Sequence, residues 1–214
     1  MSPVTRHSSL RLYLASANPG KLREFAAAAQ PRGIEVRALA GFLRLAPCIE
    51  DGATFEENAR KKALHYSAFT SELVFADDSG ICVDALGGAP GVHSARFAGP
   101  NATDDANNQK LIEELRRLER KARESGTNLA PVSRAAHYAC VIALARQGRI
   151  LAVVEGRADG VIVDQPRGTG GFGYDPYFYF PPLGNTFAEL SPEEKFAVSH
   201  RGEAFRKLLD VLPE

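Results

Sequence analysis

Residues 10–30 read LRLYLASANPGKLREFAAAAQ and join an apolar run, a turn signal and an amphipathic segment without interruption. The apolar run at residues 10–15 predicts a β-strand. Asn18-Pro19-Gly20 is typical of a turn. Apolar side chains then recur at helical spacing through residues 21–30, which predicts a helix. Strand, turn and helix therefore follow one another closely at the start of the fold.

The rest of the chain alternates strand-like and helical patterns. Thr54-Phe55-Glu56-Glu57 is a capping box that predicts a helix to about Thr70. Thr103 is expected to cap a third helix, whose apolar stripe is Leu111, Leu115 and Leu118. The remaining predicted elements are strands at 34–38, 73–76, 81–83, 137–145, 150–163 and 177–180, and a last helix at 199–212. Hairpin-like strands with interspersed helices favour an α/β fold built on a mixed sheet.

Length and composition are those of a globular protein. The chain has 214 residues, of which 44% are hydrophobic and 24% charged, and this balance excludes a disordered chain. The length suits one large domain or two small lobes. Residues 1–9 are polar and aperiodic and predict a flexible tail, so residues 10–214 are expected to form a single domain. The most polar stretch, residues 120–134, is expected to be a mobile surface excursion.

The charge balance and the cysteines narrow the possible partners. Lys and Arg number 26 and equal Asp and Glu, so no dominant positive field favours nucleic acid or an anionic membrane. No apolar run approaches the roughly 20 residues of a membrane span. Cys48, Cys82 and Cys140 fit neither a disulfide framework nor a zinc site. We expect a cytoplasmic protein that binds neither nucleic acid nor membrane.

The turn between the first strand and the first helix could hold phosphate. Its residues are Ser16, Ala17, Asn18, Pro19, Gly20 and Lys21. Backbone N–H groups at a helix N-terminus attract anions, and Lys21 adds a positive charge. The pattern is not a Walker loop, because Leu22 follows the lysine. The alternative is a solvated lysine after an ordinary turn.

Adjacent carboxylates lie where the pattern predicts that two strands break, at Asp77-Asp78-Ser79. Carboxylate oxygens suit Mg²⁺ or act as a general base, and Glu50 is a candidate for a further metal ligand. Because neighbouring strand residues point to opposite faces, only one aspartate is expected to face the site. The alternative is a pair of turn-forming or capping aspartates.

Two further clusters lie in the last quarter of the chain. Residues 168–173 match the glycine spacing of a dinucleotide site, but they lead into turn and strand residues rather than a helix. Glycines around Phe172 instead suggest an exposed ring available for base stacking, or alternatively a tight turn with a core phenylalanine. Lys195, His200 and Arg201 bring cationic groups together, and Arg201 could read a carbonyl or a phosphate. The alternative for Arg201 is an ion pair with a neighbour such as Glu194.

Taken together, these motifs resemble the inosine triphosphate pyrophosphatase family of the Ham1 type. The resemblance runs in order from about Leu10 to Leu212, and its motifs are residues 16–21, 50–59, 76–80, 87–91, 168–176 and 199–202. It departs from the family at Asp51, where members often have Thr, and residues 125–134 look longer than expected. Neither departure touches the expected chemistry.

The resemblance implies a fold and an activity. The fold is an elongated mixed β-sheet flanked by helices, with two lobes and an active-site cleft between them. The activity is Mg²⁺-dependent hydrolysis of the nonstandard nucleoside triphosphates ITP, dITP and XTP to the monophosphate and pyrophosphate, a house-cleaning role. The family members are usually homodimers.

The resemblance also implies a role for each matching residue. Asp78 would be the general base and, with Glu50, a Mg²⁺ ligand. Substrate would be bound by Ser16, Ala17, Asn18, Pro19, Gly20, Lys21, Ser79, Phe172, Gly173, Tyr174, Asp175, Lys195, His200 and Arg201. Because a 6-oxo purine offers an acceptor where adenine offers a donor, Arg201 should favour ITP over ATP. Guanine shares the 6-oxo group, so Arg201 alone does not explain rejection of GTP.

Two competing functions remain at this point. A pyrophosphatase of the related Maf type would act on pyrimidine triphosphates, and Phe172 and Arg201 argue against it. A nucleotide-binding regulator would bind the same ligand without turnover. Pyrophosphate release, compared between ITP and UTP, separates the three.

Overall fold

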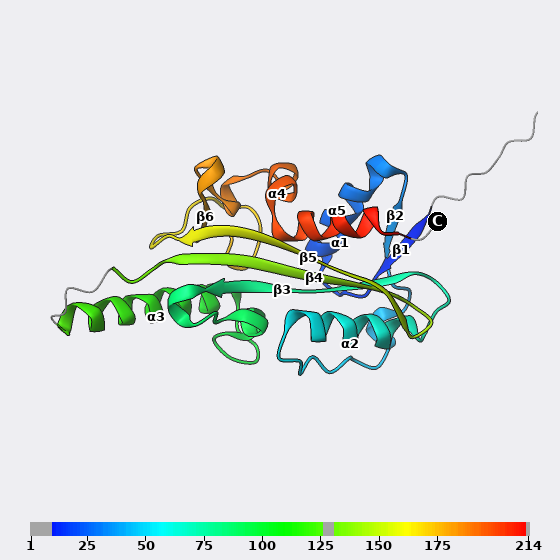
Figure 1. The fold of residues 1–214 in the computed structure, drawn as a ribbon, viewed down its shortest axis with the longest axis horizontal. Helices are drawn as coiled ribbons and strands as arrows, with labels where there is room; N and C mark the ends of the chain where they lie inside the picture. Colours follow the sequence, from blue (N-terminus) through cyan, green and yellow to red (C-terminus); the bar gives the residue numbers. More distant parts are fainter. Residues whose placement is uncertain (1–9, 126–130, 213–214) are drawn as a thin grey trace, which may run out of the picture.

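The computed structural model describes residues 10–125 and 131–212. Within these residues seven strands form one sheet in the order β2-β1-β3-β4-β5-β6-β7. The strands are β1 Arg11–Leu14, β2 Glu35–Ala38, β3 Val74–Val83, β4 Ala135–Arg146, β5 Arg149–Ile162, β6 Phe178–Phe180 and β7 Asn185–Thr186. β1 pairs in parallel with β2 and β3, and all other pairs are antiparallel. The expected mixed sheet is confirmed, and long strands run along an elongated molecule (Figure 1).

Helices flank this sheet. They are α1 Pro19–Ala29, α2 Phe55–Ser67, α3 Asp104–Glu124, α4 Pro192–Val198 and α5 His200–Asp210. α1 and α5 cover one face of the central strands and α2 covers the other (Figure 1). None of the helices in the described part of the chain has the length and apolar character needed to cross a membrane.

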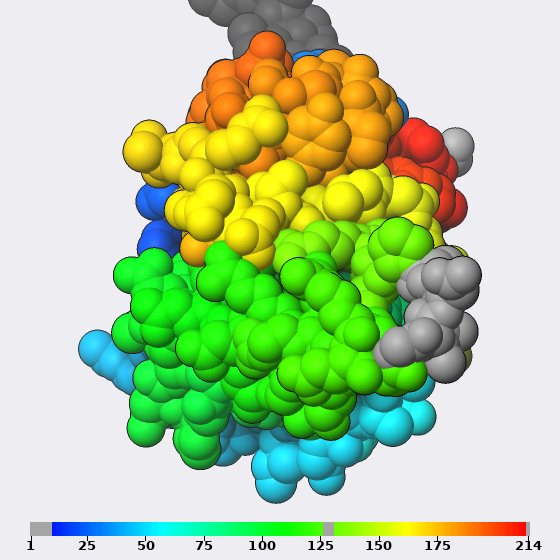
Figure 2. All heavy atoms as spheres, turned by 90° about the vertical axis from the view of Figure 1, so that its left-hand side faces the viewer, coloured from blue at the N-terminus to red at the C-terminus, as the bar shows by residue number. Residues whose placement is uncertain are grey.

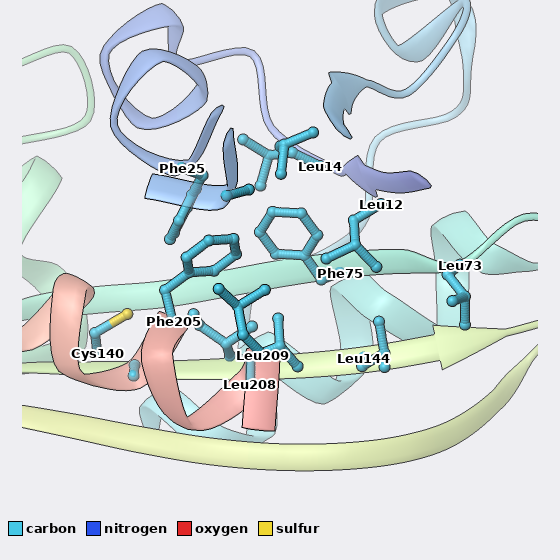
Figure 3. Close-up of a cluster of buried hydrophobic side chains, with 14 residues drawn as sticks. Leu12, Leu14, Phe25, Leu73, Phe75, Cys140, Leu144, Phe205, Leu208 and Leu209 are labelled. Atoms are coloured by element: carbon cyan, nitrogen blue, oxygen red, sulfur yellow. The ribbon is translucent and has the colours of Figure 1, made fainter. Parts of the chain in front are cut away.

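Alternation along β3 separates two hydrophobic clusters on opposite faces of the sheet. Phe75 points to the side of α1 and α5, where its ring lies 5.2 Å from that of Phe25, and Phe25 lies 4.8 Å from Phe205 (Figure 3). Val74 and Ala76 point to the other side and pack with Ala59 and Ala63 of α2.

A third cluster lies further along the long strands and joins Leu111 and Leu115 of α3 to Tyr138 and Phe178. Figure 2 views this end of the molecule, where α3 in green lies below the yellow and orange segments that contain β5 and β6. The hydrophobic core therefore divides into two regions along the sheet.

The prediction that two strands break at Asp77-Asp78-Ser79-Gly80 is wrong. β3 runs without interruption from Val74 to Val83 and pairs with β4 over its whole length. The polar side chains do not break the strand because residues from helices on both faces bind them.

Other boundaries also differ from prediction. α3 continues to Glu124 and so takes up the first part of the stretch expected as an excursion, because its charged residues form a helix surface. Leu118 is only half-buried, unlike Leu111 and Leu115. α4 and β7 were not predicted. The expected tail at residues 1–9 and residues 126–130 of the expected excursion lie outside the described residues.

Candidate functional site

A cavity of about 440 Å³ opens beside the middle of β3. β1 pairs with β3 only as far as Phe75, so residues 76–80 of β3 have no strand partner on that side among the described residues. The cavity lies at this free edge, between the two regions of the core. The predicted site residues that line it are Ser16, Ala17, Asn18, Lys21, Glu50, Asp78, Ser79, Phe172, Gly173, Tyr174, Asp175, Lys195, His200 and Arg201. Pro19 and Gly20 are not among its lining residues, and Gly20 lines a second cavity beside Phe172.

Both Asp77 and Asp78 line this cavity, so the expectation that only one aspartate would face the site is wrong. Their side chains do point to opposite faces of the sheet, as strand geometry requires. Because the cavity lies at the free edge of β3, it is open to both faces.

Asp77 lies on the face of α1 and α5 and is 2% exposed. Its Oδ2 is 2.8 Å from Lys21 Nζ and 3.9 Å from Arg201 Nε. Burial raises the pKa of Asp77, but the charges of Lys21 and Arg201 outweigh it and hold the pKa below its usual range. Asp77 is therefore a carboxylate at neutral pH and fixes both cations.

Asp78 lies on the face of α2, beside two polar residues one helical turn apart. Asn58 Nδ2 donates to Asp78 Oδ2 at 3.0 Å, and Lys62 Nζ is 3.5 Å from Asp78 Oδ1. Burial raises the pKa of the Asp78 carboxyl above its usual range, although Lys62 and Asn58 act in the opposite direction. The neighbouring carboxyls of Asp77 and Asp78 therefore have pKa values shifted in opposite directions.

Lys62 joins Asp78 to Glu50. Its ammonium lies 2.7 Å from Glu50 Oε2, and it is 8% exposed. Burial lowers the pKa of Lys62, but the neighbouring carboxylates outweigh it, so that its pKa is raised. Glu50 and Asp78 thus share one cation.

The arrangement of Glu50 and Asp78 fits a divalent cation. Both carboxylates reach a single ammonium, so their oxygens already converge on a position for positive charge. No group of three or more His, Cys, Asp or Glu suited to a metal occurs in the part of the chain that the structure describes. Mg²⁺ is commonly held by one or two carboxylates together with phosphate oxygens and water, so two protein ligands are sufficient.

The turn before α1 is preorganised by its own side chains. Asn18 caps the helix and accepts hydrogen bonds from the backbone N–H groups of Gly20 at 2.8 Å and Lys21 at 3.2 Å. Ser16 Oγ accepts one from Asn18 N–H at 3.1 Å. The Lys21 side chain is only 16% exposed and is bound to Asp77, which rules out the alternative of a solvated lysine.

Arg201 lies at the other end of the cavity with carboxylates on both sides. It is 3% exposed and donates to Glu24 Oε2 at 2.7 Å and to Ser79 Oγ at 3.2 Å. The neighbour suggested by the alternative, Glu194, instead closes the capping box of α4. Burial lowers the pKa of Arg201, but Glu24 and Asp77 outweigh it and raise the pKa further.

Phe172 and Asp175 form a second part of this end. Lys195 Nζ lies 4.7 Å and Arg201 Cζ 5.3 Å from the centroid of the Phe172 ring, which are cation–π distances. Asp175 Oδ2 accepts from Lys195 Nζ at 2.6 Å and from Phe172 N–H at 2.8 Å. The half-buried ring therefore lies against the cations at the cavity wall.

His200 is a neutral group in this site. It is 3% exposed, and its ring stacks on Tyr138 at 4.5 Å between centroids. Its Nδ1 has no hydrogen-bond partner among the described residues. Burial, and then the charges of Arg201 and Lys195, lower the pKa of His200 well below its usual range.

The structure adds residues that the sequence reasoning did not single out. They are Glu24, Asn58, Lys62 and Asp104. A signal for two of them was available, because Asn58 and Lys62 lie one turn apart within the apolar stripe of α2, beside Ala59 and Ala63. Polar residues on the inner face of a helix need buried partners.

Comparisons with known proteins agree with this fold and identify the family. The sequence profile of the Ham1 family matches residues 12–211. The dITP/XTP pyrophosphatase of Geobacillus kaustophilus is 48% identical, with 92% of this chain and 91% of that protein covered. The dITP/XTP pyrophosphatase of Desulforamulus reducens is 45% identical, with 95% and 96% covered.

Solved structures support the same family assignment. The structure of a HAM1 protein from Coxiella burnetii matches with a TM-score of 0.81 and 40% identity, covering 94% of this chain and 98% of that one. That of the Staphylococcus aureus Ham1 protein matches with a TM-score of 0.77 and 36% identity, covering 94% and 96%. The chain belongs to the Ham1 family.

Proposed function

We propose that this protein hydrolyses the nonstandard purine nucleoside triphosphates ITP, dITP and XTP to the monophosphate and pyrophosphate, with Mg²⁺ as cofactor. The observation that carries the proposal is one cavity with carboxylates Glu50 and Asp78 on one side and Lys21 and Arg201 on the other. A nucleoside triphosphate needs a metal site, a phosphate site and a base site within one cavity. Relatives named dITP/XTP pyrophosphatase support the same activity.

Glu50 and Asp78 would hold the Mg²⁺ ion. When bound, the ion would neutralise charge on the phosphate oxygens and lower the pKa of water. Lys62 would leave its position between the two carboxylates and keep its charge close to the phosphates. The remaining steps fall to side chains of the protein.

The residues divide the reaction between them. Lys21 and the first turn of α1 would bind phosphate oxygens, with Asp77 keeping Lys21 in place. Asp78 would accept a proton from the attacking water. Attack at the α-phosphorus breaks the bond to the β-phosphate, so that pyrophosphate leaves and the monophosphate remains.

The donor set at the other end would read the base. Arg201 can only donate, and it favours a purine with an oxygen at C6 over adenine. Phe172 would stack on the purine. The interactions of Arg201 with Glu24 and Ser79 support this role, because they fix the direction of the guanidinium.

The setting of the activity is also part of the proposal. We propose a homodimeric cytoplasmic protein with a single domain over residues 10–214, whose partner is the nucleotide and not nucleic acid or membrane. Family resemblance supports the dimer, and the equal numbers of acidic and basic residues support the absence of a nucleic-acid partner. Light scattering on the purified protein measures the oligomeric state, and a monomer would contradict it.

The test of the reaction is product analysis with one matched pair of variants. Wild-type protein with ITP and Mg²⁺ is expected to release pyrophosphate and inosine monophosphate in equal amounts. Asp78→Asn is expected to lower kcat by roughly 10²-fold or more while nucleotide binding stays measurable. Asp84→Asn changes an exposed aspartate just beyond β3 and is expected to leave kcat unchanged.

Two outcomes would contradict the proposed reaction. Release of inorganic phosphate in place of pyrophosphate would mean attack at another phosphorus. Binding of ITP without turnover by the wild-type protein would instead favour a regulator.

A further inference from the structure

The loop that carries Phe172 is held by the start of α3, where Asp104 also lines the cavity. Gly173 N–H donates to Asp104 Oδ2 at 2.6 Å, and Gly173 C=O accepts from Asn108 Nδ2 at 2.9 Å. Asp104 and Asn108 are four residues apart in one helix and therefore present their side chains on the same face. The two peptide units on either side of Gly173 are thus both tied to α3.

The backbone conformation at Gly173 explains why the loop needs the two hydrogen bonds from α3. Gly173 has a φ of +63°, in the left-handed region that favours glycine, and a Cβ there would meet no atom within 4 Å. The requirement for glycine is therefore conformational, and no side chain at this position packs to hold the loop. Hydrogen bonds to the backbone do so instead.

The residues after Gly173 are anchored in the core, and Phe172 is joined to them by the hydrogen bond from its backbone N–H to Asp175. Tyr174 is 4% exposed, and its hydroxyl donates to Ser94 C=O at 2.8 Å. Asp175 is bound by Lys195 and by the Tyr138 hydroxyl. Phe172 is half-buried at the cavity wall. The turn at Gly173 sets the direction of its ring relative to the buried Tyr174 and Asp175.

The burial of Asn108 also supports a positioning role. It is 4% exposed, and its Oδ1 has no hydrogen-bond partner among the described residues. A buried acceptor without a partner costs free energy that an apolar residue would avoid. An asparagine at this position can donate a hydrogen bond to Gly173 C=O, which an apolar residue cannot do.

We propose that Asp104 and Asn108 are positioning residues that fix Phe172 against Arg201 and Lys195, and that through this loop they set the selectivity for the purine base. The inference rests on the proposed function for its substrate. Neither side chain is required to take part in the chemistry at phosphorus. Their loss should therefore change base discrimination more than the chemical step.

The test compares Asp104→Ala and Asn108→Ala with Asp105→Ala. Asp105 is exposed in the same first turn, and its side chain makes no hydrogen bond or ion pair with the described residues. Hydrogen exchange is measured over residues 171–176, and kcat and KM are measured for ITP and ATP. Asp104 lies at the surface, so its variant is expected to fold even if Asn108→Ala does not.

In Asp104→Ala the loop amides are expected to exchange faster. The ratio of kcat/KM for ITP to that for ATP is expected to fall roughly tenfold, as one charge-assisted hydrogen bond supports, mostly through KM for ITP. Asp104→Asn keeps an oxygen acceptor and should recover most of the ratio. Asp105→Ala should match the wild type in both measurements.

Two results would overturn the inference. One is unchanged exchange of the loop amides in Asp104→Ala, which would mean that the helix does not hold the loop. The other is faster exchange with an unchanged ITP to ATP ratio, which would mean that the loop position does not set selectivity. Failure of the proposed function is distinguishable from both, because the wild-type protein would then turn over neither nucleotide.

Discussion

Lys62 Nζ on α2 lies 3.5 Å from Asp78 Oδ1 on β3, and the same ammonium is 2.7 Å from Glu50. A positive charge therefore already lies at the proposed metal site. Because the ammonium and Mg²⁺ would occupy neighbouring positions on the same two carboxylates, binding of the metal without nucleotide must work against Lys62.

Replacing Lys62 should therefore increase stabilisation by Mg²⁺. We expect Lys62→Met to show a larger rise in Tm on addition of saturating Mg²⁺ than the wild type, because ligands that bind the folded state stabilise it by mass action. Lys61→Met is the matched control, since Lys61 pairs with the exposed Asp51 one position along the chain. Equal Mg²⁺-dependent shifts in Lys62→Met and in the wild type would refute competition at these carboxylates.

His200 predicts a pH dependence of stability. Its pKa is well below the usual value in the folded protein, whereas in the unfolded chain it is near 6.5. Below about pH 6.5 the unfolded state therefore binds a proton that the folded state does not, and the free energy of unfolding falls by up to about 1.4 kcal/mol per pH unit. Above this pH the contribution is fully present.

His200→Phe removes this titration while it keeps a ring against Tyr138. Denaturant unfolding between about pH 6.5 and 5 should show a shallower loss of stability in this variant than in the wild type. The exposed His93 provides the control, and His93→Phe should follow the wild-type slope. A wild-type slope in His200→Phe would contradict the assignment of His200 as a buried neutral group.

The geometry of Arg201 predicts the effect of a charge-conserving change. Arg201→Lys keeps a positive charge near Glu24 and Asp77 but loses the planar fork that contacts Glu24 and Ser79. The fold should be retained, while the ITP to ATP ratio of kcat/KM falls by roughly one to two orders of magnitude. Steady-state kinetics with both nucleotides checks this, and an unchanged ratio would remove Arg201 from base reading.

The close packing of α5 on β5 at Gly156 links the stability of the fold to the position of Arg201 in the site. A Cβ at this position would overlap the backbone of His200 and Ala204, so α5 packs directly on the strand. Gly156→Ala should push α5 away, lower Tm and reduce kcat/KM together, because Arg201 moves with the helix. Glu155→Ala changes the exposed neighbour on β5 and should do neither. A reduced Tm with full activity would show that α5 need not be held this closely.

Much of the site could be predicted because short local signals determine its elements. The turn signal at Asn18-Pro19-Gly20 and the cap at Thr54 place Lys21 and the inner face of α2 correctly. These signals depend on residues within one helical turn of each other. A sequence pattern resolves interactions on that scale.

The continuity of β3 could not be predicted in the same way. A run of Asp77, Asp78 and Ser79 is unfavourable in an isolated strand, and it is stabilised here by Lys21, Arg201, Asn58 and Lys62 from three helices. Those partners are close only in the folded protein. α4 was not predicted for another reason. Its seven residues are too few to show helical periodicity, although Ser191 and Glu194 form a capping box.

The proposed function is metal-dependent cleavage of ITP and XTP in this cavity, in preference to ATP and UTP. Pyrophosphate release from ITP, XTP, ATP and UTP, each with Mg²⁺ and with EDTA, tests it most directly. We expect turnover that requires Mg²⁺ and favours ITP and XTP over ATP and UTP by about two orders of magnitude or more. Equal turnover of all four nucleotides, a preference for UTP, or full activity in EDTA would contradict it.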